Sequence, residues 1–265
     1  MSVIIRDRFC GIKKLKSLLL RIFNKLENNG NANFNSNGEN HFIDSLISSI
    51  SEAKDVCIFD IGANTGDYSS ILFEKINSKN INAQIHLFEP TNSCFKTIRE
   101  KFQGINNIYL NNFGASDLDG EAKIFYDKEQ SGLASLYQRN LECYNISMNY
   151  IESINLKRLD SYIKFKGIKH INFVKIDIEG HELKALEGFG SYLSADFIDY
   201  IQFEYGGANL DSKTSLMELY MFFLGKGFTV AKVMPKGLEI RQYNPFMENF
   251  SYANYMAISN KLINK

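Results

Sequence analysis

Acidic side chains stand at the ends of two apolar segments in the first hundred residues. Residues 56–59 (VCIF) form a continuous apolar run that leads to Asp60, and residues 84–88 (QIHLF) lead to Glu89. A short apolar run of this kind is typical of an interior parallel strand, and open α/β sheets bind their ligands at the carboxyl ends of such strands. The spacing therefore predicts that Asp60 and Glu89 face one ligand.

The turn after this first strand reads DIGANTG over residues 60–66. Glycine lets the backbone take positive φ and approach a ligand closely. The dinucleotide fingerprint GxGxxG is absent, which argues against a nicotinamide oxidoreductase. A carboxylate beside the turn repels phosphate but suits a ligand with an ammonium and a sulfonium, as in S-adenosylmethionine. The candidate cofactor contacts in this turn are Asp60, Gly62, Ala63, Asn64 and Gly66. The alternative is that the turn only reverses the direction of the chain.

The ribose and adenine of such a ligand have candidate partners further along the chain. In nucleoside-binding sheets a carboxylate at the end of the second strand accepts both ribose hydroxyls, and Glu89 is placed for this role. Residues 114–117 (GASD) combine small side chains, which admit a flat ring, with a carboxylate that can accept from an amino group. Ser116 and Asp117 are therefore candidate adenine contacts, with an ordinary turn before strand 121–126 as the alternative.

A dense polar cluster interrupts the apolar segment 172–178. Lys175, Asp177 and Glu179 share one face of a strand because side chains alternate, and His181 follows Gly180 at the start of a helix. The flanking residues are apolar, which favours a central strand opening into a catalytic site over an edge strand carrying an ion pair. We expect His181 or Asp177 to act as general base, Glu179 to orient it and Lys175 to steady the carboxylates. We assign no metal; a divalent ion held by Asp177, Glu179 and Glu204 is the less favoured variant.

Apolar periodicity places these motifs in an alternating βαβα chain. Helices are predicted after most strands, and segments 228–234 and 254–259 are predicted to form an antiparallel pair at the sheet edge. Residues 131–155 are polar and irregular, which is typical of a lid or substrate loop.

Overall composition limits the remaining function classes. The 265 residues are 45% hydrophobic with a formal charge of zero, enough for one large core and no indication of nucleic acid as a partner. The four cysteines are scattered and show neither zinc spacing nor a disulfide framework. Nothing in the sequence specifies an oligomeric state.

The N-terminal region differs from the rest of the chain. Residues 1–26 carry seven Lys/Arg against one Asp, a formal charge of +6, and residues 9–26 are predicted to form a basic amphipathic helix. This helix either lies on an anionic membrane surface or packs on the domain or a partner chain, which we favour slightly. It is too short and charged to span a bilayer and lacks secretory-signal features, so we expect a cytoplasmic protein, membrane-peripheral if the helix binds lipid. The Asn/Gly-rich residues 27–40 are predicted to be a flexible linker, and 41–265 the folded domain.

Several motifs together resemble the FkbM-type methyltransferases. They are DIGANTG, LFEP, GASDLDGEA, LDSYI, FVKIDIEGHELKALEGF and QFEYG, and the resemblance covers residues 41–260, leaving the N-terminal segment outside. It implies a Rossmann-like class I fold with a seven-stranded, mostly parallel sheet, an antiparallel last strand and helices on both faces. It also implies transfer of a methyl group from S-adenosylmethionine to a hydroxyl, often on a sugar, glycan or related natural product. By the resemblance, the cofactor loop is matched by Asp60, Gly62, Asn64 and Gly66, the ribose acid by Glu89, and the block near the methyl group by Asp177, Glu179 and His181. A non-catalytic S-adenosylmethionine-binding or nucleoside-binding protein on the same fold is the alternative.

Overall fold

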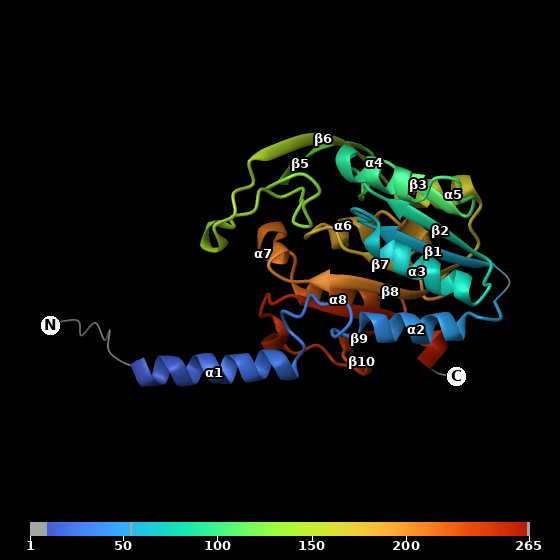
Figure 1. Ribbon diagram of the computed structural model, residues 1–265. Coiled ribbons are helices and arrows are strands. Elements are labelled where there is room, and N and C mark those ends of the chain that lie inside the picture. The colour runs from blue at the N-terminus through green and yellow to red at the C-terminus, as the bar shows by residue number, and fades with distance from the viewer. Residues whose placement is uncertain (1–9, 54, 264–265) are drawn as a thin grey trace.

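An eight-stranded sheet forms the centre of the molecule (Figure 1). The computed structural model describes residues 10–53 and 55–263. The strands follow the order β10-β9-β11-β8-β7-β1-β2-β3. In chain order their bounds are β1 Val56–Ile61, β2 Ala83–Phe88, β3 Ile108–Asn111, β7 Ile171–Ile176, β8 Ile198–Tyr205, β9 Phe228–Met234, β10 Gly237–Ile240 and β11 Ala253–Ser259. β1 and β7 are buried along their whole length, as their apolar runs predict.

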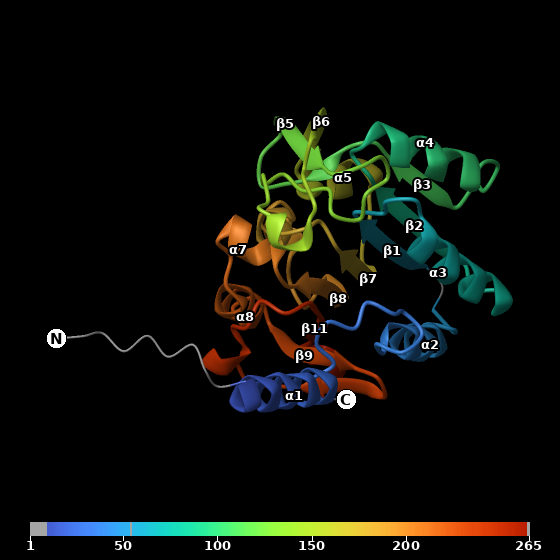
Figure 2. The ribbon, with the colours of Figure 1, turned by 60° about the vertical axis from the view of Figure 1, so that its left-hand side comes forward.

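Helices cover both faces of this sheet (Figure 2), and the buried apolar side chains form two clusters. On one face lie α2 Glu39–Ser49, α3 Asp67–Ser78 and α4 Asn92–Lys101; on the other lie α5 Leu159–Lys166, α6 Glu182–Glu187 and α8 Leu216–Leu224. Successive residues of β1 divide between the clusters, with Phe59 in one and Ile58 in the other. This is the alternation that a strand buried on both faces requires.

The predicted α/β class with a mostly parallel sheet is confirmed, but the predicted seven strands are one too few. β11 is antiparallel to both β8 and β9 and lies between them instead of at the edge. The edge is formed by β10, which pairs antiparallel with β9 after a two-residue turn at Pro235 and Lys236. Residues 237–240 have only partial apolar alternation, so their sequence does not predict this strand.

A second, three-stranded sheet lies beside the carboxyl edge of the main one. It has the order β4-β6-β5, with β4 Gly114–Ala115, β5 Gly120–Tyr126 and β6 Tyr150–Lys157. β5 and β6 form an antiparallel pair, and the connection between them, residues 127–149, contains the short helix η1 Glu142–Tyr144. This connection extends on the side toward which the β8 arrow points (Figure 1). The remaining short helices are η2 Gly190–Tyr192, α7 Ala208–Ser212, η3 Pro245–Met247 and α9 Asn260–Ile263.

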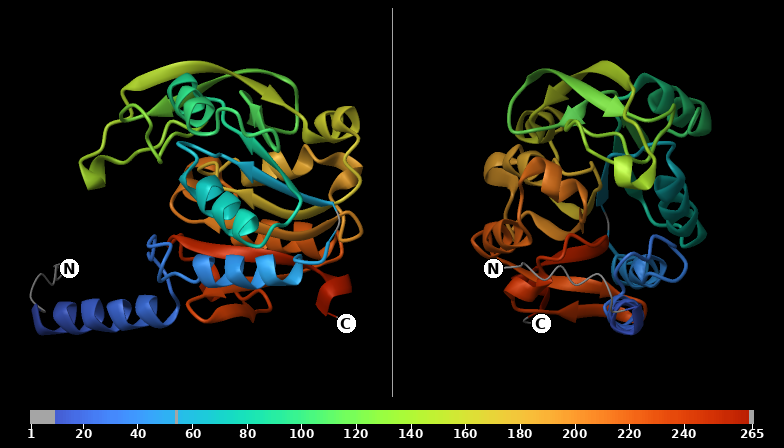
Figure 3. Two further views of the ribbon diagram at one scale, coloured as in Figure 1. Left: turned by 45° about the vertical axis from the view of Figure 1, so that its right-hand side comes forward. Right: turned by 90° about the vertical axis from the view of Figure 1, so that its left-hand side faces the viewer.

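The N-terminal helix, α1 Cys10–Leu26, projects from the body of the molecule (Figure 3). The prediction of a basic helix over residues 9–26 is tested only from residue 10, since residues 1–9 lie outside the described residues. Among the helices that the structure describes, none has the length and apolar character needed to cross a bilayer.

Residues 27–40 differ from the predicted flexible linker in their contacts. Asn28, Asn29 and Asn37 are buried, and the Asn28 Nδ2 donates to the carbonyl oxygens of Asn37 and Val233. Asparagine side chains can pair with buried backbone groups, so an Asn-rich composition does not require a solvated segment. The division of the chain into three parts stays a prediction.

Candidate active site

Two cavities lie side by side at the carboxyl edge of the main sheet. The inner cavity, of about 70 Å³, lies between the ends of β1 and β2 and the small sheet. The outer cavity, of about 850 Å³, lies between the 127–149 connection, α7 and the segments around Gly30 and Tyr252. Gly132, Asp177 and Glu179 line both cavities. Asp177 and Glu179, two of the three residues of the signature block (Asp177, Glu179 and His181), therefore lie at the boundary between the two cavities.

Glu89 lies in the wall of the inner cavity and is only 5% exposed. Its Oε1 accepts from Thr91 N at 2.8 Å and Thr91 Oγ1 at 2.6 Å, and its Oε2 accepts from Asn64 N at 2.9 Å. Burial raises the pKa of Glu89, and these hydrogen bonds oppose the shift. A carboxylate offers about four lone-pair positions, so Glu89 keeps capacity for a further donor.

The DIGANTG loop divides into residues that line the inner cavity and residues that shape the turn. Gly62 and Asn64 line it. Ala63 is buried in the core and donates its N–H to the Phe88 carbonyl, while Gly66 takes φ 77° at the start of α3. Ala63 and Gly66 thus differ from the prediction of direct cofactor contact, because the turn directs their atoms toward the core and α4.

Gly62 is the loop position with the least room for a side chain. Its φ is 86°, and a Cβ would lie 2.0 Å from the Asp177 carbonyl oxygen. We expect Gly62→Ala to lower the free energy of unfolding by about 2 kcal/mol or more, from backbone strain and overpacking together, and to abolish cofactor binding. Thermal unfolding and calorimetry measure both effects. Gly120→Ala is the matched control, because no atom lies within 4 Å of the added Cβ there; equal stability of the two variants would contradict the assigned geometry.

Asp60 differs from its predicted role. It is fully buried, and its Oδ2 accepts from the Ser69 hydroxyl of α3 at 2.5 Å. Side chains alternate along a strand, so Asp60 and its neighbour Ile61 point to opposite faces of the sheet. Ile61 lines the inner cavity, and Asp60 therefore points away from it. Burial raises the pKa of Asp60. Of the two acids that are expected to face one ligand, only Glu89 lines the inner cavity, while Asp60 lies beneath the loop.

Ser116 and Asp117 also lie behind the inner cavity, whose wall is formed by the preceding Gly114 and Ala115. The Ser116 hydroxyl lies 3.1 Å from Asp117 Oδ1 and 3.0 Å from His181 Nε2, and Lys184 Nζ donates to Asp117 Oδ2 at 3.1 Å. Of the four residues 114–117, Gly114 and Ala115 line the cavity, and the predicted adenine contacts Ser116 and Asp117 do not. The Asp117 carboxylate is instead engaged by Lys184.

His181 lines the inner cavity but not the outer one. Both ring nitrogens have hydroxyl neighbours, Ser116 Oγ at Nε2 and Tyr137 Oη, 3.1 Å away, at Nδ1. Burial lowers the pKa of His181 to about 4, so the imidazole is neutral near pH 7. A neutral ring held at both nitrogens is suited to positioning a ligand of the inner cavity more than to accepting a proton.

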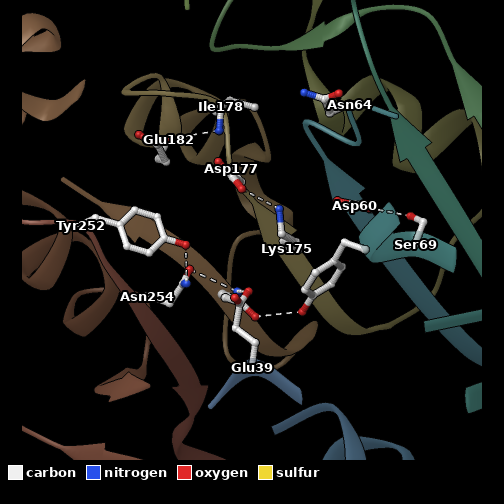
Figure 4. A network of polar contacts seen from close by, with 12 residues as sticks. Glu39, Asp60, Asn64, Ser69, Lys175, Asp177, Ile178, Glu182, Tyr252 and Asn254 are labelled. Atoms are coloured by element: carbon white, nitrogen blue, oxygen red, sulfur yellow. Dashed lines mark hydrogen bonds and ion pairs between the residues drawn. The ribbon is translucent and has the colours of Figure 1, made fainter. Parts of the chain in front are cut away.

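The end of β7 carries a chain of alternating charges (Figure 4). Lys175 Nζ donates to Asp177 Oδ2 at 2.9 Å, and Lys175 lies between Asp177 and the side of β1 where Asp60 meets Ser69. Burial lowers the pKa of Lys175, but the carboxylates of Asp177 and Asp60 raise it overall. Burial likewise raises the pKa of Asp177, and Lys175 holds it below its ordinary value. Lys175 lines neither cavity, so it acts on ligands only through Asp177.

Glu179 has a strained backbone and a buried ion pair. Its φ is 50°, a left-handed conformation that residues other than glycine rarely adopt, and Gly180 follows with φ 100°. The turn is held by Glu182 Oε1, which accepts from the N–H groups of Ile178 and Gly180. Arg139 Nη1 donates to Glu179 Oε2. Burial and the charge of Asp177 raise the pKa of Glu179 to about 8, although Arg139 pulls it down.

Glu204, at the end of β8, completes a group of carboxylates with Asp177 and Glu179. One oxygen from each lies within 4.8 Å of the others. Burial and the charge of Asp177 raise the pKa of Glu204 well above its usual range. The cations Lys175 and Arg139 already pair with two of the three carboxylates.

Three residues of the 127–149 connection belong to the site and were missed by the sequence analysis. Arg139 pairs with Glu179 and with Asp211 of α7, Tyr137 contacts His181, and the Ser135 hydroxyl donates to the Glu179 carbonyl at 2.7 Å. Residues 131–155 are predicted to be a lid or substrate loop, and residues within 131–146 line both cavities; the role of the loop stays a prediction. No periodicity marks these residues, so a lone Arg in a polar loop was the only available signal.

Comparison with known proteins identifies the family. The sequence model described as "Methyltransferase FkbM domain" matches residues 60–243, which is more than half of the chain. The chain belongs to the FkbM methyltransferase family. This FkbM methyltransferase is 23% identical over 209 residues to "Methyltransferase 1" of Beauveria bassiana (strain ARSEF 2860), covering 73% of this chain and 80% of that protein.

Solved methyltransferases are similar at lower sequence identity. Precorrin-6y C5,15-methyltransferase from Geobacter metallireducens GS-15 has 11% identity and a TM-score of 0.42, covering 83% of this chain and 88% of its own. Aeropyrum pernix fibrillarin, solved with natively bound S-adenosyl-L-methionine, has 12% identity and a TM-score of 0.42, covering 77% and 66%.

S-adenosylmethionine is the cofactor of this FkbM methyltransferase, and the chemistry of the inner cavity fits it. Glu89 keeps an acceptor position for a ribose hydroxyl, and apolar walls from β1, β2 and the small sheet suit adenine. At Gly114 a Cβ would lie 2.9 Å from Leu156 Cδ2, so only glycine leaves this wall thin. The 131–136 wall of this cavity is tied to the cofactor loop, because Asn64 Nδ2 donates to the Ser131 carbonyl at 3.1 Å.

Proposed function

We propose that this methyltransferase transfers the methyl group to a hydroxyl of a sugar, glycan or related natural product held in the outer cavity. The observation that carries this proposal is the shared boundary of the two cavities at Asp177 and Glu179. With the cofactor in the inner cavity, an acceptor in the outer cavity meets it at these two carboxylates. Holding two reactants in near-attack geometry can supply about 7 to 11 kcal/mol of the barrier.

The outer cavity has the mixed lining that a polyhydroxylated acceptor requires. Its lining includes carboxylates and an arginine together with the aromatic residues Tyr144, Phe250 and Tyr252. Charged groups can orient hydroxyls by hydrogen bonds, and aromatic faces pack against the apolar side of a ring. This combination supports a sugar-like acceptor more than a wholly apolar one.

When bound, S-adenosylmethionine supplies an electrophilic methyl group on a sulfonium. The residues of the chain then have to remove a proton from the acceptor hydroxyl as its oxygen forms the new bond. Glu179 is placed for this, since it lines both cavities and its pKa of about 8 lies near neutral pH. Asp177, held ionised by Lys175, would orient the acceptor, and His181 would position the cofactor side together with Ser116 and Tyr137.

A panel of sugars and glycans incubated with the protein and isotopically labelled S-adenosylmethionine tests the acceptor class. We expect labelled methyl ethers to form on hydroxyl groups, identified by mass spectrometry. Transfer to a nitrogen or carbon acceptor only would overturn the hydroxyl assignment. Stoichiometric cofactor binding with no transfer to any acceptor would favour the non-catalytic binding protein.

Removal of divalent metal ions is expected to leave the transfer rate unchanged. Lys175 and Arg139 already neutralise two of the three clustered carboxylates, which reduces the charge available to a cation. The measurement compares rates before and after dialysis against a chelator. A loss of activity that added Mg²⁺ restores would show instead that Asp177, Glu179 and Glu204 hold a metal.

A further inference from the structure

Helix α1 has an apolar face that is largely exposed in the described part of the chain. Six apolar residues recur at helical spacing along it and are each between 46% and 70% exposed: Ile12, Leu15, Leu19, Ile22, Phe23 and Leu26. At 3.6 residues per turn they fall within one stripe. Figures 1 and 3 show the helix projecting from the body, which explains these exposures. A long exposed apolar stripe of this kind marks an interaction surface.

The base of α1 is held firmly although the helix itself is free of the body. Just after its last residue, Glu27 pairs with Lys232 of β9 and with Arg241. Lys232 Nζ also donates to Asn29 Oδ1 at 2.6 Å, and Gly30 N donates to the Tyr252 carbonyl at 2.8 Å. Buried polar contacts thus fix the point from which α1 projects.

The charges of α1 indicate what binds to this face. The helix contains five Lys/Arg and no Asp or Glu. The chain has 30 Lys/Arg and 30 Asp/Glu, of which seven Lys/Arg and one Asp lie in residues 1–26. Residues 27–265 therefore carry 23 Lys/Arg and 29 Asp/Glu, a formal charge of −6. Lys16 and Lys25 flank the apolar stripe on either side by helical spacing. Anionic lipid headgroups attract such clusters, and the apolar face of the helix enters the acyl boundary.

We propose that α1 binds the surface of an anionic lipid bilayer. A second copy of the chain is the less suitable occupant, since two α1 helices packed face to face would bring their flanking lysines together. Asn24, in the last turn of α1, lines the outer cavity together with Gly30 and Ala32. Docking of α1 therefore brings the outer cavity close to the bilayer.

Flotation of the full-length protein with lipid vesicles tests the proposal without any methyl transfer, so the result is independent of the proposed function. We expect binding to vesicles that contain phosphatidylglycerol, weakening with added salt, and much weaker binding to phosphatidylcholine alone. Lys16→Glu with Lys25→Glu should weaken binding at least about tenfold, and Leu19→Glu with Ile22→Glu should abolish it. The matched control is Lys79→Glu with Lys96→Glu, two exposed lysines outside α1, which should bind normally.

Two outcomes overturn the proposal. The first is equal binding to both kinds of vesicle by the unaltered protein. The second is a dimer, detected by light scattering without lipid, that Leu19→Glu with Ile22→Glu dissociates, because the stripe then joins two copies of the chain. All substituted side chains are exposed, so thermal unfolding should be unchanged in every variant.

Discussion

Glu179→Gln is expected to lower the rate of methyl transfer by about 10²- to 10⁴-fold, the usual contribution of a general base. The carboxylate lies at the boundary of the two cavities, where the acceptor hydroxyl meets the cofactor side. Glutamine has nearly the same shape but cannot accept a proton. Cofactor affinity, measured by calorimetry, should change little, so the loss should fall on kcat.

The pH dependence separates Glu179 from His181 as the base. Burial and Asp177 raise the pKa of Glu179 to about 8, whereas burial lowers that of His181 to about 4. A base works only when deprotonated, so activity dependent on Glu179 rises as pH increases through about 8 and levels off above it. A base at His181 gives a limb near pH 4 and a flat profile at neutral pH.

Arg139 provides the matched variant for this profile. Its guanidinium lowers the pKa of Glu179, so Arg139→Gln should move the rising limb to higher pH while leaving the enzyme active at alkaline pH. A purely structural role for Glu179 would leave the limb in place. Full activity of Glu179→Gln, with an unaltered profile, would reject Glu179 as the base.

Glu89→Ala is expected to weaken S-adenosylmethionine binding by about 1.5 to 3 kcal/mol, or about 10- to 10²-fold in Kd. A hydrogen bond to a charged group contributes about this much, and the carboxylate has one acceptor position left for the ribose beside those taken by Asn64 and Thr91. Isothermal titration measures the change. Glu121→Ala, an exposed glutamate on β5, is the control and should bind normally.

Glu89 also accepts three hydrogen bonds from Asn64 and Thr91, so its removal affects the loop as well as the ligand. Glu89→Gln keeps the shape and allows a sharper comparison. An S-adenosylhomocysteine analogue without the 2′-hydroxyl should bind more weakly than S-adenosylhomocysteine to the unaltered protein, and the difference should shrink in Glu89→Gln. An equal difference in both proteins would place the ribose elsewhere.

The sequence predicted the order of strands and helices well because apolar periodicity reports burial directly. It placed Glu89 and Asp177 at strand ends, and both line the inner cavity. For Asp60 the same reasoning failed, since position at a strand end does not say which face a side chain occupies. That face depends on the register of β1 against β2 and β7, and Asp60 falls on the α3 side.

Other parts of the site lay beyond sequence reasoning for different physical reasons. Arg139 and Tyr137 come from an irregular connection, where side chains are positioned by tertiary contacts and leave no periodic pattern. Burial disfavours the charged form of each side chain, so it raises the pKa of Glu179 and lowers the pKa of His181. The sequence alone does not show this burial. The sequence named the residues of the signature block, and the fold decides their roles.

A crystal structure with bound S-adenosylhomocysteine tests most directly whether the cavity beside Glu89 and Asp177 holds the cofactor. We expect the ribose hydroxyls within hydrogen-bond distance of the Glu89 carboxylate, adenine against Gly114 and Ala115, and the sulfur facing the boundary formed by Asp177 and Glu179. A nucleoside bound elsewhere, with the Glu89 carboxylate touching no part of it, would contradict the account.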